Sequence, residues 1–502
     1  MWAWLLACAP APTGVDAGLT GCDSIATWYP DADGDGFGAE DGVPTQACAA
    51  PIGQVANAGD CDDTDPARFP GNDDPCDGID NNCDGVLDPV DSRGFRDLDG
   101  DGAGDGASPI DVCDLLTPAA ANSWDCDDAD RSIPVFVSAG AAADGTGALA
   151  APLRGLDEAL HTDVACIRLL PGTYPTAVTF RGRDVDVAST DGPELTVLEG
   201  TTEDSVVTIW AGETRATVLE GFTLRGGGGK STYAKWEDEG VIYDADIRYG
   251  GGLLVDGASP TLRSLSVVDN VLPDATRDDG GSPVLLTQSQ GAGLFLQNGA
   301  PLLEDLVVDR NQATYGAAVY VGFDADVTLR RVRIAENASD YGNVYVAWGS
   351  LTAANLLLDA NRSNLGYDGM LVFYGSVDLA NSTVVDHSLG LTTWGASSIT
   401  VRSSIFYGNG TGVADDGVVA STWLLAYDDI YGNTTDTENL PVTDPEPVGA
   451  DPEFVSYTPD GLWNDDLGLS AGSPCRDAGD PASTDPDGTR ADVGVTGGPF
   501  AP

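Results

Sequence analysis

The rear two thirds of the chain repeats a pattern of short apolar runs broken by Gly, Asn or Asp. Successive blocks begin 25, 26, 27 and 21 residues apart, at Gly291, Gly316, Gly342, Gly369 and Gly390. Each block has the pattern of several brief strands, without a helical period. This repeat predicts an all-β fold, a right-handed parallel β-helix solenoid whose coils bury their inward side chains only by stacking on one another.

One turn of the repeat carries a recurring amide side chain. Stacked Asn side chains can hydrogen-bond from coil to coil and tolerate a left-handed backbone, so we predict a structural ladder at this turn. Its expected members are Asn270, Asn311, Asn337 and Asn361, followed by Asp386, Asn409 and Asn433, with His387 beside them.

Residues 16–133 have a different pattern, since they hold 28 acidic side chains and only four arginines. The segment also repeats: DADGDGFG at 31–38 returns as DLDGDGAG at 97–104, and DCDDTD at 60–65 returns as DCDDAD at 125–130. So few apolar residues cannot form a large core. We predict a small, loop-rich module that disulfides and calcium stabilise; a solvated acidic linker is the alternative.

The spacing of the aspartates indicates cation binding. Asp at positions 1, 3 and 5 of a turn directs oxygens at one centre, and Gly at position 6 allows the sharp bend of a Ca2+ loop. Hard oxygen ligands select Ca2+, or else Mg2+ or Mn2+, over zinc and copper. The predicted ligands are Asp31, Asp33, Asp35, Asp60, Asp62, Asp63, Asp65, Asp80, Asn82, Asp84, Asp88, Asp91, Asp97, Asp99, Asp101, Asp105, Asp125, Asp127, Asp128 and Asp130.

Seven of the 10 cysteines lie between Cys22 and Cys126, in a segment without His or Met, which favours disulfides in an oxidising compartment. Equal spacings of 13 residues predict one loop-closing disulfide in each copy, with a third nearby. The predicted pairs are Cys48 with Cys61, Cys113 with Cys126, and Cys76 with Cys83, which leaves Cys22, Cys166 and Cys475 without evident partners.

The strings DADGDGFG, DCDDTDPARFPG and CDGIDNNCDGVLD resemble the MopE-type metal-binding repeat of bacterial surface proteins, over roughly residues 28–131. The resemblance implies a secreted, metal-binding module attached to another domain. Copper, to which the family name refers, has little support here because the His and Met positions are empty.

The segments 144–174 and 469–499 resemble the first and last parts of secreted pectin-lyase-like β-helix proteins, with a short capping helix near 156–161. This resemblance implies the fold of residues 134–499. It leaves the activity open, because the fold serves lyases, hydrolases and proteins that only bind.

The net charge of -57 makes nucleic acid and anionic membranes poor partners and divalent cations good ones. Leu5-Leu6-Ala7-Cys8 resembles a lipobox, which predicts lipidation of Cys8 or, alternatively, plain secretion. No run approaches the ~20 apolar residues of a membrane span. We expect an extracytoplasmic protein with a truncated signal at 1–15, the module at 16–133, the β-helix at 134–440 and a C-terminal cap at 441–502.

The sequence offers few candidates for the catalytic groups that enzymes with this fold use. The sequence has no Gly-His-Gly, and we interpret His161 and His387 as structural residues. Arg330, Arg331 and Arg333 could act as a lyase base, but their clustering favours charge balance on an acidic face. The adjacent carboxylates at 415–416 and 428–429 would point to opposite faces of a strand, so we interpret them as turn residues.

Aromatic residues recur just before the turn glycines. Insertions at 228–249 and 271–290 precede the same glycine position in successive coils, so they should project from the coils side by side. Exposed aromatic rows suit sugar rings; the alternative is that they only stabilise the stacked turns. The predicted glycan-binding residues are Tyr233, Trp236, Tyr249, Tyr315, Tyr341 and Tyr367, with a second row of Trp348, Tyr374 and Trp394. The sequence therefore favours a non-catalytic adhesion, envelope or glycan-binding protein over a lyase or hydrolase acting on acidic polysaccharide.

Overall fold

The fold is taken from a computed structural model, which divides the chain into two compact units, Met1–Arg131 and Ser132–Pro502. The structure describes residues 25–39, 42–72, 79–85, 93–98, 103–111, 119–120, 122–126, 134–238, 241–272, 288–440, 444, 446–458 and 464–501. Each unit is described by itself below.

The first unit consists of short strands joined by Asp- and Gly-rich turns. Its Trp28 indole donates to the Ala47 carbonyl, and Phe37 stacks on Phe69 with ring centroids 5.5 Å apart. The sheets are β3 (Thr45–Ala47), β1 (Ala26–Pro30) and β4 (Gln54–Val55); the parallel pair β2 (Phe37–Ala39) and β5 (Asn57–Asp60); and β7 (Asp105–Asp111), β6 (Arg93–Arg96) and β8 (Ala119–Ala120).

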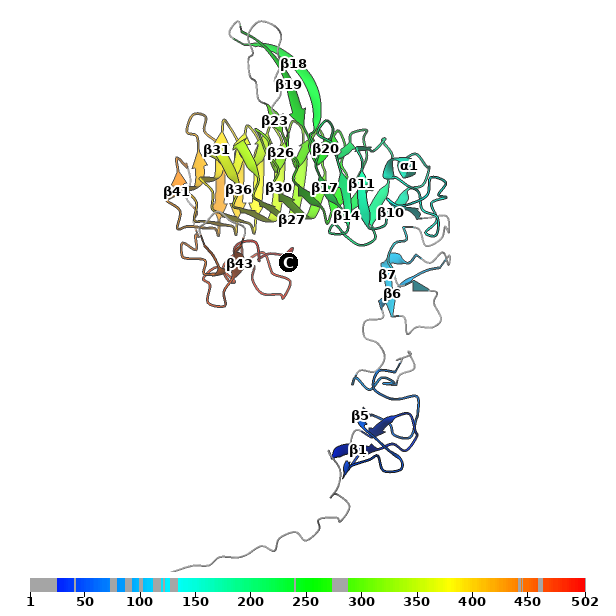
Figure 1. The fold of residues 1–502 in the computed structure, drawn as a ribbon. Coiled ribbons are helices and arrows are strands. Elements are labelled where there is room, and N and C mark those ends of the chain that lie inside the picture. The colour runs from blue at the N-terminus through cyan, green and yellow to red at the C-terminus, as the bar shows by residue number, and fades with distance from the viewer. Residues whose placement is uncertain are drawn as a thin grey trace, which may run out of the picture. The chain divides into compact units, whose positions relative to one another are not determined.

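The second unit is a stack of coils with three parallel faces (Figure 1). In several coils one long strand runs through both the first and the second face.

The first face contains β9 (Val135–Val137), β10 (Cys166–Leu169), β13 (Asp186–Ser189), β16 (Val218–Glu220), β21 (Thr261–Arg263), the leading parts of β25 (Leu302–Asp309), β27 (Asp326–Ala335) and β30 (Ser350–Asp359), then β33 (Ser376–Ala380), β36 (Ser398–Arg402) and β39 (Thr422–Ala426). The second contains β11 (Gly172–Pro175), β14 (Thr196–Glu199), β17 (Thr223–Arg225), β22 (Ser266–Val268), the trailing parts of β25, β27 and β30, then β34 (Thr383–Val385), β37 (Ile405–Tyr407) and β40 (Asp429–Tyr431).

The third face contains β12 (Val178–Thr179), β15 (Val207–Ile209), β20 (Leu253–Asp256), β24 (Leu294–Gln297), β26 (Val319–Val321), β29 (Val344–Ala347), β32 (Met370–Phe373), β35 (Leu389–Trp394), β38 (Thr411–Asp415) and β41 (Thr435–Glu438). Its register follows the repeat, because Leu294 pairs with Val319, Val319 with Val344, and Val344 with Met370. Fully buried Leu and Val side chains fill the inside of the coils. The predicted all-β parallel β-helix is confirmed.

The turn ladder exists, but one predicted member is wrong. Asn270, Asn311 and Asn337 each donate to the next Asn, at 3.0 Å, ending at Asn361. The next position belongs to His387, whose imidazole contacts the Asn361 amide at 3.2 Å. Its backbone N–H donates to Asn409, which in turn donates to Asn433 at 2.9 Å. Asp386 has a left-handed backbone, with φ 59°, and accepts a hydrogen bond from Tyr457 instead.

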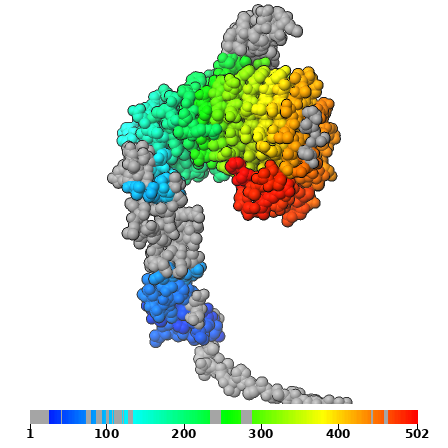
Figure 2. Space-filling model, turned by 180° about the vertical axis from the view of Figure 1, so that it is seen from behind, coloured from blue at the N-terminus to red at the C-terminus, as the bar shows by residue number. Residues whose placement is uncertain are grey.

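A helix covers the first coils, and the C-terminal segment packs beside the later coils. The helix α1 (Leu156–Leu160) buries Leu156, Ala159 and Leu160 over the first coils, at the predicted place. After the last coil, β42 (Phe454–Ser456) and β43 (Asp466–Leu469) form an antiparallel pair, and the tail packs along the coils, coloured red in Figure 2. The Asn355 amide donates to two carbonyls of this tail, those of Val495 and Gly497, at 2.7 Å each.

Shorter strands project from the corner between the second and third faces. The hairpin β18 (Lys230–Asp238) and β19 (Val241–Tyr249) extends outward (Figure 1), and β23 (Ser289–Gln290) pairs with β19. The row continues through the bridge from Gln290 to Tyr315 into β28 (Ala338–Tyr341) and β31 (Arg362–Tyr367). We call the row formed by β23, residues 312–315, β28 and β31 the wall. Among the described residues, no helix is long and apolar enough to cross a membrane.

Candidate metal centre and candidate glycan groove

Five of the predicted metal ligands meet in the first unit. Carboxylate oxygens of Asp31, Asp33 and Asp63 lie within 4.8 Å of one another, and so do those of Asp33, Asp35 and Asp60. Asp33 belongs to both groups, so the two clusters are adjacent, and we call the five aspartates together the centre. The turn 31–36 supplies three carboxylates, Asp60 at the end of β5 supplies the fourth, and Asp63 in the segment after β5 supplies the fifth.

In this centre, backbone amides hold one oxygen of each carboxylate. Gly34 N–H donates to Asp31, and Phe37 N–H donates to Asp35. The second oxygens of Asp33, Asp35 and Asp60 are buried and have no hydrogen-bond partner. Asp60 is only 2% exposed. Buried carboxylate oxygens that lack donors are costly unless a cation binds them, so the centre fits a hard divalent ion.

The electrostatics of the centre agree with this geometry. Removal from water raises the pKa of Asp33, and the neighbouring carboxylates of Asp35, Asp31 and Asp63 raise it further. The pKa of Asp60 is raised by the same causes, burial first and then Asp35, Asp33 and Asp63. A bound cation would oppose both causes, because it stabilises the ionised form.

The other predicted ligands lie elsewhere. Asp62 forms an ion pair with Arg68 at 2.7 Å, and Asp65 accepts from the Ala67 amide, so neither joins the centre. In the turn 80–85, both oxygens of Asp80 accept backbone N–H groups, and the Asn82 amide donates to Asp84. Asp97 and Asp125 are buried, and the backbones of Asp105 and Asp125 pair in an isolated parallel β-bridge. Outside the described residues lie Asp88, Asp91, Asp99, Asp101, Asp127, Asp128 and Asp130.

The disulfide pairing within the module differs from the prediction. Cys61 bonds to Cys83, 22 residues away, so the pairs Cys48 with Cys61 and Cys76 with Cys83 are wrong. Cys48 follows β3 and Cys61 follows β5, strands of different sheets, so the sequence distance of 13 residues does not bring their sulfurs together. The bond ties the segment carrying Asp60 and Asp63 to the turn 80–85, and it occupies both sulfurs near Asp60.

The other cysteines divide into bonded and free. Cys48, Cys126 and Cys166 are disulfide-bonded, which corrects the expectation that Cys166 lacks a partner. Cys475 is buried as a free thiol. Cys8, Cys22, Cys76 and Cys113 lie outside the described residues, and so does the predicted pairing of Cys113 with Cys126.

An aromatic groove of about 320 Å³ lies between the wall and the third face. Tyr315 and Tyr341 stack on the wall side, with ring centroids 4.8 Å apart, and Tyr341 stacks on Tyr367 at 6.0 Å. Tyr320 and Tyr345 lie on the third face and stack at 5.6 Å. The groove is lined by Gln288, Gln290, Tyr315, Tyr320, Tyr341, Tyr345, Trp348, Phe373 and Trp394.

The second predicted aromatic row is only partly right. Trp348 stacks on Tyr374 at 6.4 Å, and Phe323, which the prediction missed, stacks on Trp348 at 4.5 Å. Trp394 pairs in register with Phe373 rather than with Tyr374, because its coil reaches the turn glycine one residue earlier. It packs edge-on against Tyr341 and Tyr367 instead. Phe323, Trp348 and Tyr374 form an exposed row, with 52%, 44% and 44% of their surface accessible.

A buried aromatic stack was also missed. Tyr249 contacts Phe295 at 5.1 Å rather than Tyr315, and Phe295 continues into Tyr320 and Tyr345. A signal exists in the sequence, since the strings GLFL, AVYV and NVYV place an aromatic at the same position of successive strands. Tyr233 and Trp236 lie in β18, where the structure describes the backbone pairing but not their side chains.

The groove has no ionisable group other than tyrosine among the described residues that line it. Burial raises the pKa of Tyr320 to about 12 and also raises the pKa of Tyr315. These phenols therefore stay protonated at neutral pH. The groove offers aromatic faces, hydroxyls and two glutamine amides, which suit the C–H faces and hydroxyls of a sugar.

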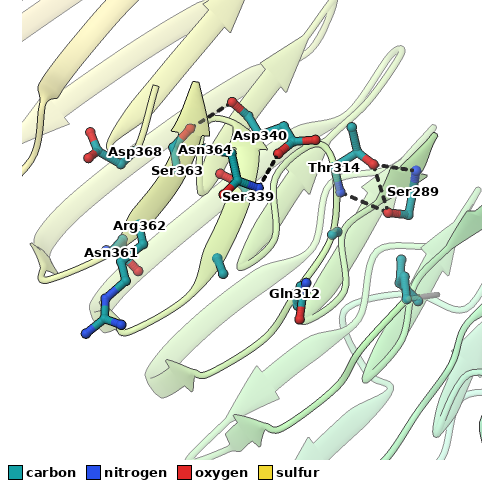
Figure 3. A pocket seen from close by; sticks show the side chains of 13 residues that line it. Ser289, Gln312, Thr314, Ser339, Asp340, Asn361, Arg362, Ser363, Asn364 and Asp368 are labelled. Atoms are coloured by element: carbon teal, nitrogen blue, oxygen red, sulfur yellow. Dashed lines mark hydrogen bonds between the residues drawn. The ribbon is translucent and has the colours of Figure 1, made fainter. Parts of the chain in front are cut away.

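On the other side of the wall lies a polar pocket of about 480 Å³ (Figure 3). Neighbouring wall residues point to opposite sides, so Thr314 lines the pocket while Tyr315 lines the groove. The side chains that line the polar pocket hydrogen-bond largely to one another. Ser289 bonds with Thr314 at 3.2 Å, and the Asn364 amide donates to Asp340 at 2.8 Å (Figure 3). This mutual bonding makes the pocket a weaker candidate for a ligand than the groove.

The candidate catalytic groups are held in structural contacts. Arg330, Arg331 and Arg333 pair with acidic residues of the preceding coil, Glu304, Asp305 and Asp309 respectively. Asp415 accepts from the Trp423 indole, and Asp428 accepts from the Ser404 amide. The His161 ring lies 2.6 Å from the Asp157 carbonyl oxygen. None of these contacts directs a reactive group into the groove.

The comparisons with known proteins concern the metal motif and the fold. A family model named Cu-binding MopE, with the description "Putative metal-binding motif", matches residues 60–89 and 125–134. No curated protein sequence matches the chain. A crystal structure of the pectate lyase Pel9A aligns with a TM-score of 0.42 and 13% identity, over 72% of this chain and 95% of that chain.

Two further solved structures align less well. XylC in complex with xylose gives a TM-score of 0.35 and 9% identity, over 60% of this chain and 66% of that chain. A pectin methylesterase in complex with a hexasaccharide gives a TM-score of 0.30 and 11% identity, over 68% of this chain and 93% of that chain. The strand pairing establishes the β-helix without them. This chain therefore carries a MopE-type metal-binding motif in its first unit, joined to a parallel β-helix.

Proposed function

We propose that this chain is an extracytoplasmic Ca2+-binding protein whose β-helix binds polysaccharide in the aromatic groove without cleaving it. The observation that carries the proposal is the exposed row of Phe323, Trp348 and Tyr374 beside a groove lined by stacked tyrosines. Aromatic faces at coil spacing offer successive platforms for the rings of a linear glycan. The absence of acidic and basic groups among the described lining residues favours binding over hydrolysis or β-elimination, which need such groups.

The metal part of the proposal rests on the centre of five aspartates. Its donors are all oxygens, and each of its two groups brings three carboxylates together, which suits the preference of Ca2+ for hard oxygen ligands. The disulfides and the metal motif support an oxidising, extracytoplasmic location. Anchoring through Cys8 and the module boundaries 16–133 and 134–440 are part of the same proposal.

A binding experiment tests the groove. Affinity electrophoresis against neutral and acidic polysaccharides should show retardation of the wild-type chain, and Trp348→Ala with Tyr341→Ala should weaken it roughly tenfold to a hundredfold, since each stacked ring contributes about 1 kcal/mol. Trp210→Ala is the matched control, because Trp210 is 51% exposed and does not line the groove. Equal binding by the double variant would refute the groove as the site. Release of reducing ends or unsaturated uronates would refute the non-catalytic role.

Calorimetry tests the metal centre. We expect the full chain to bind Ca2+, and Asp33→Asn to remove the tightest phase because Asp33 belongs to both carboxylate groups. Asp65→Asn is the matched control, since Asp65 lies in the same repeat but outside the centre. A titration that Asp33→Asn leaves unchanged would exclude this centre, and stronger binding of Cu2+ than of Ca2+ would correct the ion.

A further inference from the structure

The polar pocket beside the wall contains a notch between two long side chains. Gln312, Ala338 and Arg362 are parallel partners, in register, on the strands of three successive coils. All three line the pocket of about 480 Å³ (Figure 3). Since adjacent strands lie about 4.8 Å apart, the backbones of Gln312 and Arg362 are separated by about 10 Å. The short side chain of Ala338 leaves the space between them open.

The side chains on either side of the notch carry hydrogen-bonding groups that the fold does not use. Arg330 and Arg331 each pair with an acidic residue of the preceding coil. Arg362 instead has Ala338 opposite it, and its exposed guanidinium has no hydrogen-bond or ion-pair partner among the described residues. The exposed side-chain amide of Gln312 likewise makes no hydrogen bond within the described part of the chain. The notch therefore lies between a group that only donates and a group that donates and accepts.

A second row of polar side chains lies two residues further along the same strands, on the same side of the wall. In this row the Asp340 backbone N–H donates to the Thr314 carbonyl at 3.0 Å. One carboxylate oxygen of Asp340 accepts from the Asn364 amide, and the other has no partner among the described residues (Figure 3). Asp368 adds a second, buried carboxylate to the pocket. The pocket thus combines an unpaired cation with two carboxylates.

We propose that this pocket binds one uncharged sugar unit, whose hydroxyls bond to Arg362, Gln312 and Asp340. A sugar hydroxyl both donates and accepts, so it can satisfy a guanidinium, an amide and a carboxylate in turn. The mixed charges disfavour ionic ligands, because Asp340 and Asp368 repel a carboxylate and Arg362 repels an ammonium group. The volume of the pocket lies in the range of small-molecule sites. The site is on the other side of the wall from the aromatic groove, and the inference does not depend on that groove.

Saturation-transfer NMR with the full chain tests the pocket, with methyl glucoside and methyl galactoside as probes. We expect the wild-type protein to bind at least one of them, and Arg362→Ala to weaken binding roughly tenfold, because hydrogen bonds to a charged group are lost. Arg215→Ala is the matched control and should bind as the wild type does. Arg215 is also exposed and unpaired among the described residues, but it does not line the pocket. Binding of neither probe by the wild type, or full binding by Arg362→Ala, would overturn the proposal.

Two further variants separate the pocket from the groove. Ala338→Leu fills the notch and should abolish binding, while unchanged hydrogen exchange in β31 shows that the wall is intact. Trp348→Ala, altered in the groove, should bind the probes as the wild type does. Loss of binding in Trp348→Ala would place the sugar in the groove and overturn the pocket, and so would full binding by Ala338→Leu. Tighter binding of glucuronate or glucosamine than of both neutral probes would overturn the assignment to an uncharged sugar.

Discussion

The two units of this chain bury opposite kinds of groups. In the first unit the deeply buried side chains include Asp60, Asp97 and Asp125, whereas the buried apolar residues among its described residues are only Ala103 and Ala120. In the β-helix the inside of the coils is filled by Leu, Val and Ile, most of them fully buried. Hydrophobic burial therefore stabilises the second unit, whereas the first unit has the Cys61–Cys83 disulfide and clustered carboxylates that could hold a metal ion. The comparison predicts that the two units differ in how strongly their folds depend on cations.

The largest expected effect comes from removing cations and disulfides together. We predict that chelator plus reductant abolishes protection from hydrogen exchange throughout 25–72, because the carboxylates of the centre then repel one another without a covalent tether. Peptides within 294–358 should keep their protection, since apolar stacking holds them. A module that stays protected from hydrogen exchange under these conditions would contradict the expected difference between the two units.

A cavity in the core of the coil stack should have an intermediate effect on stability. Leu329 is fully buried in β27, so Leu329→Ala should lower the free energy of unfolding of the β-helix by roughly 2–5 kcal/mol. Leu424→Ala, at a position 53% exposed, is the control and should change it by less than about 0.5 kcal/mol. Denaturant unfolding followed by far-UV circular dichroism measures both. Equal effects of the two substitutions would contradict a core built by stacking.

The smallest effect concerns acid sensitivity of the turn ladder. Burial lowers the pKa of His387 from 6.5 to about 4, against the raising effects of Asp368 and Asn409, while Asn361 contacts the other side of the ring. The folded state favours the neutral form of His387. The contribution of His387 to the free energy of unfolding is therefore complete above the unfolded pKa of about 6.5, and it is lost as the pH falls from about 6.5 towards 4. At pH 5 the loss is roughly 2 kcal/mol.

The two histidines of the chain allow a matched test of this prediction. His387→Asn should remove that part of the difference between unfolding free energies at pH 7 and pH 5, because an amide can fill the ladder position without titrating. His161→Asn should leave the difference unchanged, since His161 lies in an exposed position after α1. An unaltered pH response in His387→Asn would show that the ladder is not the acid-sensitive part of the stack.

The sequence by itself determined the repeat, the β-helix, most of the Asn ladder and the turns that present Asp31, Asp33 and Asp35. Each of these follows from local spacing, because strand periodicity and turn geometry depend on residues close in the chain. The aromatic residues before the turn glycines were visible for the same reason, and Tyr315, Tyr341 and Tyr367 do stack.

Only the tertiary structure decided which distant groups meet. It brought Asp60 and Asp63 to the turn 31–36, paired Cys61 with Cys83, and put His387 rather than Asp386 into the ladder. It also moved Trp394 out of the row of Trp348, because one coil is a residue shorter before its glycine. The physical reason is that such contacts depend on sheet register and on single backbone angles, such as the left-handed φ of Asp386, which local patterns do not encode.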